Sequence, residues 1–110
     1  MTSKPVSIQW TPFALRCLDE IHDFIQYQEK AVEPADQLIN MLFERVDQLI
    51  DFPESGQEEP LLKEIGQNSR YLVEFNYKII YEFDQKRSRI IITDVFHASQ
   101  DPGKLKRESR

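Results

Sequence analysis

Three successive runs decide the fold: Arg70-Tyr71-Leu72-Val73-Glu74-Phe75-Asn76, then Tyr77-Lys78-Ile79-Ile80-Tyr81-Glu82-Phe83, then, after six polar residues, Ile90-Ile91-Ile92-Thr93-Asp94-Val95-Phe96-His97. In the first two runs apolar residues alternate at positions 71, 73 and 75 and at positions 77, 79, 81 and 83. A period of two predicts strands with these side chains on a core. The third run is β-branched almost throughout, which predicts a more deeply buried strand. Because the connections are short, we expect an antiparallel meander.

The segment before the meander predicts one strand and two helices. Residues 6–10 alternate and indicate a short edge strand, and Thr11-Pro12 is a helix start signal for a helix that runs to about residue 30. Glu33-Pro34 marks a break before a second helix, which ends at Phe52-Pro53. Residues at three- and four-residue spacing predict the core faces of the two helices: Ala14, Cys17, Leu18, Ile21, Phe24 and Ile25, then Ala35, Leu38, Ile39, Leu42, Phe43, Val46, Leu49 and Ile50.

The predicted fold class is therefore α+β, with an N-terminal strand and an antiparallel helical hairpin packed on a small, mainly antiparallel sheet in the order β-α-α-β-β-β. Residues 53–60 are rich in turn formers and acids and are expected to form a loop, and residues 61–66 to form a short helical turn. The whole chain, 110 residues, is expected to be a single domain, 1–110, with a basic tail from about residue 98 to 110.

Composition narrows the function classes. The content of 40% hydrophobic and 30% charged residues is that of a globular protein, and no apolar run is long enough to span a membrane, so we expect no membrane partner. The start of the chain has no apolar signal-peptide core, and the single Cys17 fits a reducing compartment, so we expect the cytoplasm. With Cys17, His22 and His97 as the only soft ligands we expect no metal site, and with three glycines a nucleotide-binding loop is hard to build, so no cofactor is expected.

The net charge of −5 is unevenly distributed. Residues 1–69 carry five Lys/Arg against thirteen Asp/Glu, whereas residues 70–110 carry nine against six. In one interpretation, the acidic residues of the first half simply form a solvated surface. In the other interpretation, the basic second half meets an anionic partner. The acidic charge of residues 1–69 argues against wrapping of the protein by nucleic acid. The basic binding candidates outside the strands are Lys86, Arg87 and Arg89 in the polar turn and Lys104, Lys106 and Arg107 in the tail.

Polar groups that could carry chemistry lie on the meander, namely Arg70, Lys78, Tyr81 and His97. In a meander the beginning of the first strand and the end of the third lie at opposite ends, so Arg70 and His97 are not expected to act as a pair. Each also has a structural interpretation: His97 as a strand-end residue bonded to a carbonyl, and Arg70 as half of an ion pair with Glu74 or a loop acid. A lysine on a polar strand face, such as Lys78, is most often simply solvated, and Tyr81 has an alternative role in packing.

The chain resembles the RelE/ParE family of bacterial toxins from toxin–antitoxin, or plasmid stabilisation, systems, over nearly its whole length. The resemblance rests on the loop Phe52-Pro53-Glu54-Ser55-Gly56, the arginine that begins Arg70-Tyr71-Leu72, the run Tyr77-Lys78-Ile79-Ile80-Tyr81, and the ending Val95-Phe96-His97-Ala98-Ser99. Lys78 and Ser99 stand where the family pattern has arginine, and Gly56 is followed by Gln57 rather than arginine.

The resemblance implies one of two activities. RelE-like members are ribosome-dependent messenger RNA endoribonucleases, in which Lys78, Arg70, His97 and Tyr81 would share the catalysis. ParE-like members bind and poison DNA gyrase and need no catalytic residue. Because loss of a positioned arginine costs a ribonuclease roughly 10²–10³ in rate, and a pI of about 5.0 suits docking into ribosomal RNA poorly, we favour the ParE-like branch.

The implied partners are a cognate antitoxin and a target, gyrase or ribosome. A homodimer or a toxin–antitoxin hetero-oligomer and a degenerate, inactive member remain open.

Overall fold

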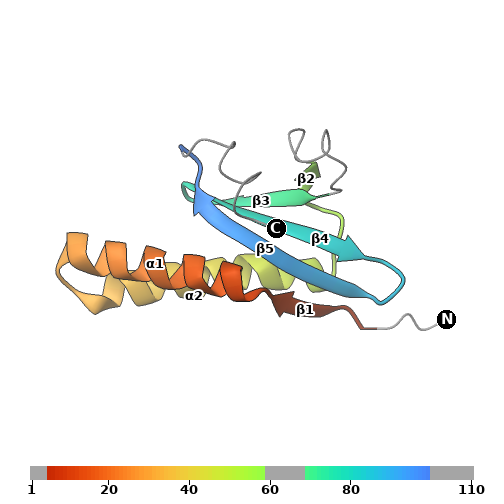
Figure 1. The fold of residues 1–110 in the computed structure, drawn as a ribbon, viewed down its shortest axis with the longest axis horizontal. Coiled ribbons are helices and arrows are strands. Elements are labelled where there is room, and N and C mark those ends of the chain that lie inside the picture. Colours follow the sequence, from red (N-terminus) through yellow and green to blue (C-terminus); the bar gives the residue numbers. More distant parts are fainter. Residues whose placement is uncertain (1–4, 59–68, 100–110) are drawn as a thin grey trace.

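The computed structural model describes residues 5–58 and 69–99. In chain order the elements are β1 (Ser7–Trp10), α1 (Pro12–Glu29), α2 (Val32–Asp47), the 3₁₀ turn η1 (Gln48–Ile50), β2 (Gln57–Glu58), β3 (Arg70–Glu74), β4 (Tyr77–Asp84) and β5 (Arg89–His97). The sheet order is β1-β5-β4-β3-β2, with β1 parallel to β5 and the other pairs antiparallel. The two helices form a hairpin that covers one face of the sheet (Figure 1). This confirms the predicted α+β class, the meander and the edge position of the first strand.

Local sequence signals set the helix ends. The Oγ1 atom of Thr11 accepts a hydrogen bond of 3.0 Å from the Ala14 N–H, and Pro12 occupies the first turn of α1. The first helix ends with Lys30 in the left-handed region, at φ 56°. The second helix begins at Val32, two residues before Pro34, so the break lies earlier than Glu33-Pro34 predicted. Proline fits there because the first turn of a helix needs no intrahelical N–H donor.

The main core lies between the hairpin and the sheet. Its fully buried members come from both helices, η1, β4 and β5: Ala14, Leu42, Leu49, Ile79, Tyr81, Ile90 and Ile92. The strand β5 is as buried as predicted. It also contains an irregularity, because Ile80 pairs with Asp94 whereas Tyr81 pairs with Ile92, which leaves Thr93 as an extra residue.

The predicted buried side was wrong in β3 and at three helical residues. In β3 the buried side chain is Leu72, whereas Val73 is exposed, because the register places Leu72 opposite the fully buried Ile79. Directly paired residues share a face, so Tyr71 and Val73 point away from the helices, whereas Phe75 lies in the turn after β3 and is exposed. In the helices Phe24 is 56% exposed, and Phe43 and Ile50 are exposed as well. The sheet is too small to cover the full width of both stripes.

The predicted loop at 53–60 contains an unexpected strand. Gln57 and Glu58 pair with Tyr71 and Arg70 as β2. A strand of two residues has no periodicity that a sequence could show. The helical turn predicted for residues 61–66 and the tail from residue 100 lie outside the described residues.

Candidate functional site

A hydrogen-bonded corner joins the start of β3 to the loop after η1. The Nη1 atom of Arg70 donates to the Gly56 carbonyl oxygen at 2.9 Å and to the Glu54 carbonyl oxygen at 3.2 Å, and its Nη2 atom lies 3.9 Å from Glu54 Oε2. The hydroxyl of Tyr81 donates to the Pro53 carbonyl oxygen and accepts from the Gly56 N–H, both at 2.9 Å. The prediction for Arg70 was an ion pair with Glu74 or with a loop acid, and the structure shows the loop acid, Glu54. Glu74 instead pairs with Arg45 at 3.5 Å.

The burial of Tyr81 suits this structural use of its hydroxyl. The residue is 0% exposed, and burial raises the pKa of the phenol, although the Gly56 N–H and Arg70 act in the opposite direction. A neutral hydroxyl can donate and accept at once, which is what Pro53 and Gly56 require.

Lys78 lies on the other side of the sheet. It alternates with Ile79 and Tyr81 along β4, so it points away from the hairpin. Its Nζ atom lies 4.3 Å from the centre of the Tyr71 ring, a cation–π contact, and Phe96 is its partner on β5. Lys78 is thus separated from Tyr81 by the thickness of the sheet.

His97 ends β5 at the far end from Arg70. It pairs with Tyr77, whereas Arg70 pairs with Tyr81, four residues along β4. At 3.3 Å per residue this separates the two backbones by roughly 13 Å along the strand, which confirms the predicted opposite ends. The Nδ1 atom of His97 lies 2.7 Å from Ser99 Oγ and accepts from the Ser99 N–H at 3.2 Å, and the imidazole meets the Tyr77 ring edge-on at 5.4 Å.

The basic turn between β4 and β5 shares one carboxylate. Arg87 Nη1 lies 3.0 Å and Arg89 Nη2 3.6 Å from Asp84 Oδ2. The hydrogen bond from Arg87 lowers the pKa of Asp84. Lys86 is exposed at the tip of the turn. The tail candidates Lys104, Lys106 and Arg107 lie outside the described residues.

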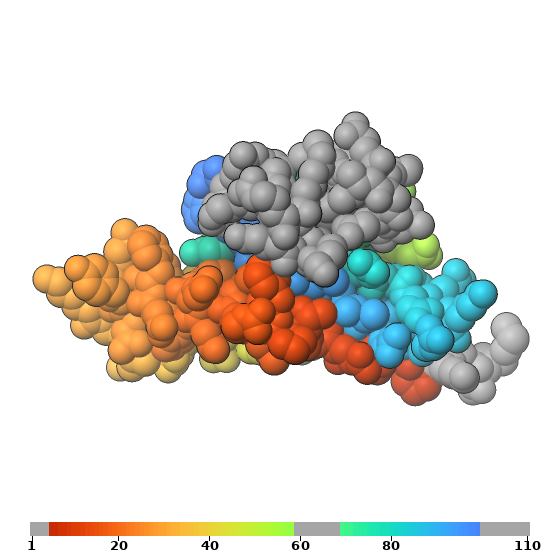
Figure 2. Space-filling view, viewed as in Figure 1, coloured from red at the N-terminus to blue at the C-terminus, as the bar shows by residue number. Residues whose placement is uncertain are grey.

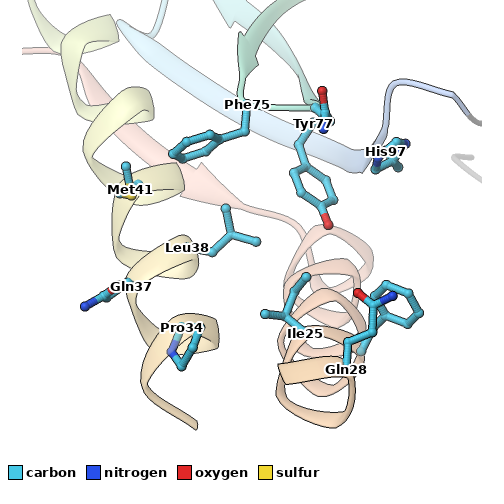
Figure 3. A pocket seen from close by; sticks show the side chains of 11 residues that line it. Ile25, Gln28, Pro34, Gln37, Leu38, Met41, Phe75, Tyr77 and His97 are labelled. Atoms are coloured by element: carbon cyan, nitrogen blue, oxygen red, sulfur yellow. The ribbon is translucent and has the colours of Figure 1, made fainter. Parts of the chain in front are cut away.

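An apolar hollow, which the sequence did not predict, lies between the helical hairpin and the β3–β4 turn. It measures about 410 Å³ and is lined by Phe24, Ile25, Gln28, Pro34, Gln37, Leu38, Met41, Phe75, Asn76, Tyr77 and His97. In Figure 3 the Tyr77 ring projects from the sheet toward the helices, with Phe75 and Met41 on one side and His97 on the other. The one feature of the sequence that could have indicated the hollow is the breadth of the predicted apolar stripes on the two helices, which are wider than packing between two helices requires.

Two features of the described residues, 5–58 and 69–99, concern metal binding and membrane insertion. No group of three or more His, Cys, Asp or Glu side chains there could hold a metal ion. No helix within those ranges is both long and apolar enough to cross a membrane.

Solved structures similar to this one include a bacterial toxin and toxin–antitoxin systems. The chromosomal ParDE system of P. aeruginosa aligns with a TM-score of 0.70 and 20% identity, over 88% of this chain and 100% of that one. The RelBE2 toxin–antitoxin complex of Mycobacterium tuberculosis aligns with a TM-score of 0.62 and 19% identity, over 86% and 99%. A double mutant of the E. coli toxin RelE in the free state aligns with a TM-score of 0.55 and 13% identity, over 96% and 95%. At these identities the likeness establishes the shared fold.

The sequence itself gives the family. The profile described as "ParE toxin of type II toxin-antitoxin system, parDE" matches residues 8–102, whereas no curated protein sequence matches significantly. The chain belongs to the ParE toxin family, and it is a type II toxin–antitoxin toxin of ParE/RelE type.

Proposed function

We propose that this toxin acts by binding a protein target, DNA gyrase, and that a cognate antitoxin neutralises it. The observation that carries the proposal is the dispersal of the four candidate catalytic side chains. Arg70 and Tyr81 hold the loop at one end of the sheet, His97 lies at the other end, and Lys78 lies on the opposite face. General acid–base catalysis needs its groups within hydrogen-bond reach of one reacting centre.

The electrostatics support the same proposal. Cleavage of RNA builds negative charge on a phosphorane, which positioned cations must stabilise. Lys78 lacks the planar fork of an arginine. Asp84 partly neutralises Arg87 and Arg89. A surface that recognises a protein does not need these charges to converge.

The antitoxin is proposed to cover the Arg70 end of the molecule. Phe43, Ile50 and Phe52 are exposed along α2, η1 and the start of the loop that Arg70 holds. An amphipathic antitoxin segment can place apolar residues on this strip and direct acidic residues to Arg70 and to the basic turn. In the ParDE and RelBE2 structures the toxin relatives belong to toxin–antitoxin systems, which supports an antitoxin partner here.

Controlled expression in bacteria tests the proposal. We expect growth arrest with filamentous cells and a DNA damage response, relieved by coexpression of the neighbouring antitoxin reading frame. Purified toxin should inhibit supercoiling of relaxed plasmid by gyrase in the same concentration range. Prompt arrest of translation with cleaved messenger would instead assign ribonuclease activity, and Lys78→Ala would then be expected to reduce cleavage at least about a hundredfold.

The basic residues provide a second test. Neutralising Lys86, Arg87 and Arg89, or deleting residues 104–110, should reduce toxicity without lowering the melting temperature if these residues contact the target or antitoxin. Unchanged toxicity would remove them from the binding surface.

A further inference from the structure

The hollow has a largely apolar lining, which includes Phe24, Ile25, Leu38, Met41 and Phe75. Its volume of about 410 Å³ falls within the range of about 300–1,000 Å³ that ligand-binding pockets occupy. Two of its large apolar side chains, Phe24 and Phe75, are 56% and 57% exposed. Exposed aromatic residues around a concavity are typical of protein interaction sites.

Phe75 is held there by a strained backbone. It has φ 55° in the two-residue connection between β3 and β4, a conformation in which glycine is strongly preferred and a bulky residue is an outlier. Nothing in the core requires the aromatic ring, because its side chain is exposed. Figure 3 shows the ring directed toward α2 and Met41, at one wall of the hollow. Strain retained for an exposed aromatic side chain is typical of functional positions.

Acidic residues flank the hollow on both helices, although none of them is among its lining residues. Glu20 lies one turn before Phe24 on α1, and Glu44 lies three residues after Met41 on α2, so helical spacing places both beside lining residues. Both are exposed. Over residues 12–47 the hairpin has eight acidic residues and three basic ones, and one of these, Arg45, is paired with Glu74. A partner with positive charge is therefore attracted to this end.

The other end of the molecule has the opposite charge. In Figure 2 the hairpin forms one end of the long axis and the β4–β5 turn the other. Residues 84–89 carry three basic side chains and one acidic one. An acidic antitoxin segment suits that basic end, whereas the acidic residues beside the hollow suit a cationic partner.

We propose that the hollow binds a basic amphipathic helix of the toxin's protein target, with Phe75 as the apolar anchor. The helix places bulky side chains between Phe24, Met41 and Phe75 and directs lysine or arginine toward Glu20 and Glu44. This inference rests on the proposed function in that the toxin acts by docking on a protein.

The decisive variant is Phe75→Gly, with Ser88→Gly as its matched control. Ser88 has φ 49° in the β4–β5 turn, so both substitutions relieve a positive φ, but only the first removes a wall of the hollow. We expect both variants to keep or raise the melting temperature. Phe75→Gly should require at least tenfold more inducer to arrest growth, whereas Ser88→Gly should behave as the wild type.

Two synthetic helical peptides test the chemistry directly on the full-length toxin. They share the same leucine positions and carry either lysine or glutamate on the polar face. Fluorescence anisotropy should show at least tenfold tighter binding of the lysine peptide in low salt, weakened by added salt. Phe75→Gly should lose that affinity, and the double variant Glu20→Lys/Glu44→Lys should reverse the preference between the peptides.

Three outcomes would overturn the inference. Full toxicity of Phe75→Gly would remove the hollow from target binding while leaving the proposed function intact. A variant that stays toxic but is no longer rescued by the antitoxin would assign the hollow to the antitoxin. Equal affinity for the two peptides would remove the charge argument. A wild-type chain without toxicity would contradict the proposed function itself.

Discussion

Replacing Tyr81 by phenylalanine removes a single buried oxygen and tests the structural interpretation of the Arg70 corner. The hydroxyl both donates to the Pro53 carbonyl oxygen and accepts from the Gly56 N–H. Losing the first bond costs about 1 kcal/mol, and leaving the buried Gly56 N–H without an acceptor adds about 1–3 kcal/mol. We therefore expect the free energy of unfolding to fall by about 2–4 kcal/mol, and the melting temperature by roughly 8–15 °C.

Chemical denaturation followed by circular dichroism gives the free energy, with Tyr71→Phe as the control. Tyr71 donates its hydroxyl hydrogen to Gln57 Oε1 at 3.0 Å in an exposed position, so the same chemical change should cost less than about 0.5 kcal/mol there. Equal effects of the two substitutions would refute the argument that Tyr81 fastens the loop.

The pH dependence adds a second, independent readout. Burial raises the pKa of Tyr81 above its ordinary value of 10.0, so the folded protein holds the phenol proton more tightly than the unfolded chain does. The corresponding stability is fully present below about pH 10 and is lost as pH rises toward the folded-state pKa. The difference in stability between wild type and Tyr81→Phe should therefore shrink above pH 10.

Two further substitutions probe neighbouring contacts. Gly56→Ala would place a Cβ atom 2.6 Å from the Tyr81 ring and hydroxyl and 2.9 Å from the Tyr71 carbonyl oxygen, so we expect it to lower the melting temperature. In a double-mutant cycle its effect should not be additive with that of Tyr81→Phe. Strict additivity would show that the two groups do not interact. Asp84→Asn should change the acid limb of the stability curve: the pKa of Asp84 is lowered chiefly by its hydrogen bond with Arg87, so its contribution is present above the ordinary value of 3.8 and disappears as pH falls through the lowered pKa. Thermal denaturation between pH 2 and pH 6 should show a shallower decline in the variant, and parallel curves would contradict this assignment.

The candidate site was only partly predictable. The sequence identified Arg70, Lys78, Tyr81 and His97 as the polar groups of the meander, and strand order alone placed Arg70 and His97 at opposite ends. It did not show that Tyr81 is fully buried and bonded to Pro53 and Gly56, because those bonds join residues 25 and 28 positions apart. It also did not show the hollow, whose walls come from α1, α2, the β3–β4 turn and the end of β5.

Local interactions explain what the sequence alone determined. Thr11 and Pro12 begin α1 through a hydrogen bond over three residues, and the alternation in β4 places Tyr77, Ile79 and Tyr81 on one face. Such features depend on neighbours along the chain, so composition and spacing specify them.

Only the tertiary structure decided which alternating side of β3 became buried and which helical residues stayed exposed. Leu72 is in the core because β4 fixes its partner as Ile79, and Phe24 stays exposed although it lies on the predicted apolar stripe of α1. Pairing between strands and the area available for burial depend on the whole chain, and a one-residue change in register reverses every side chain of a strand.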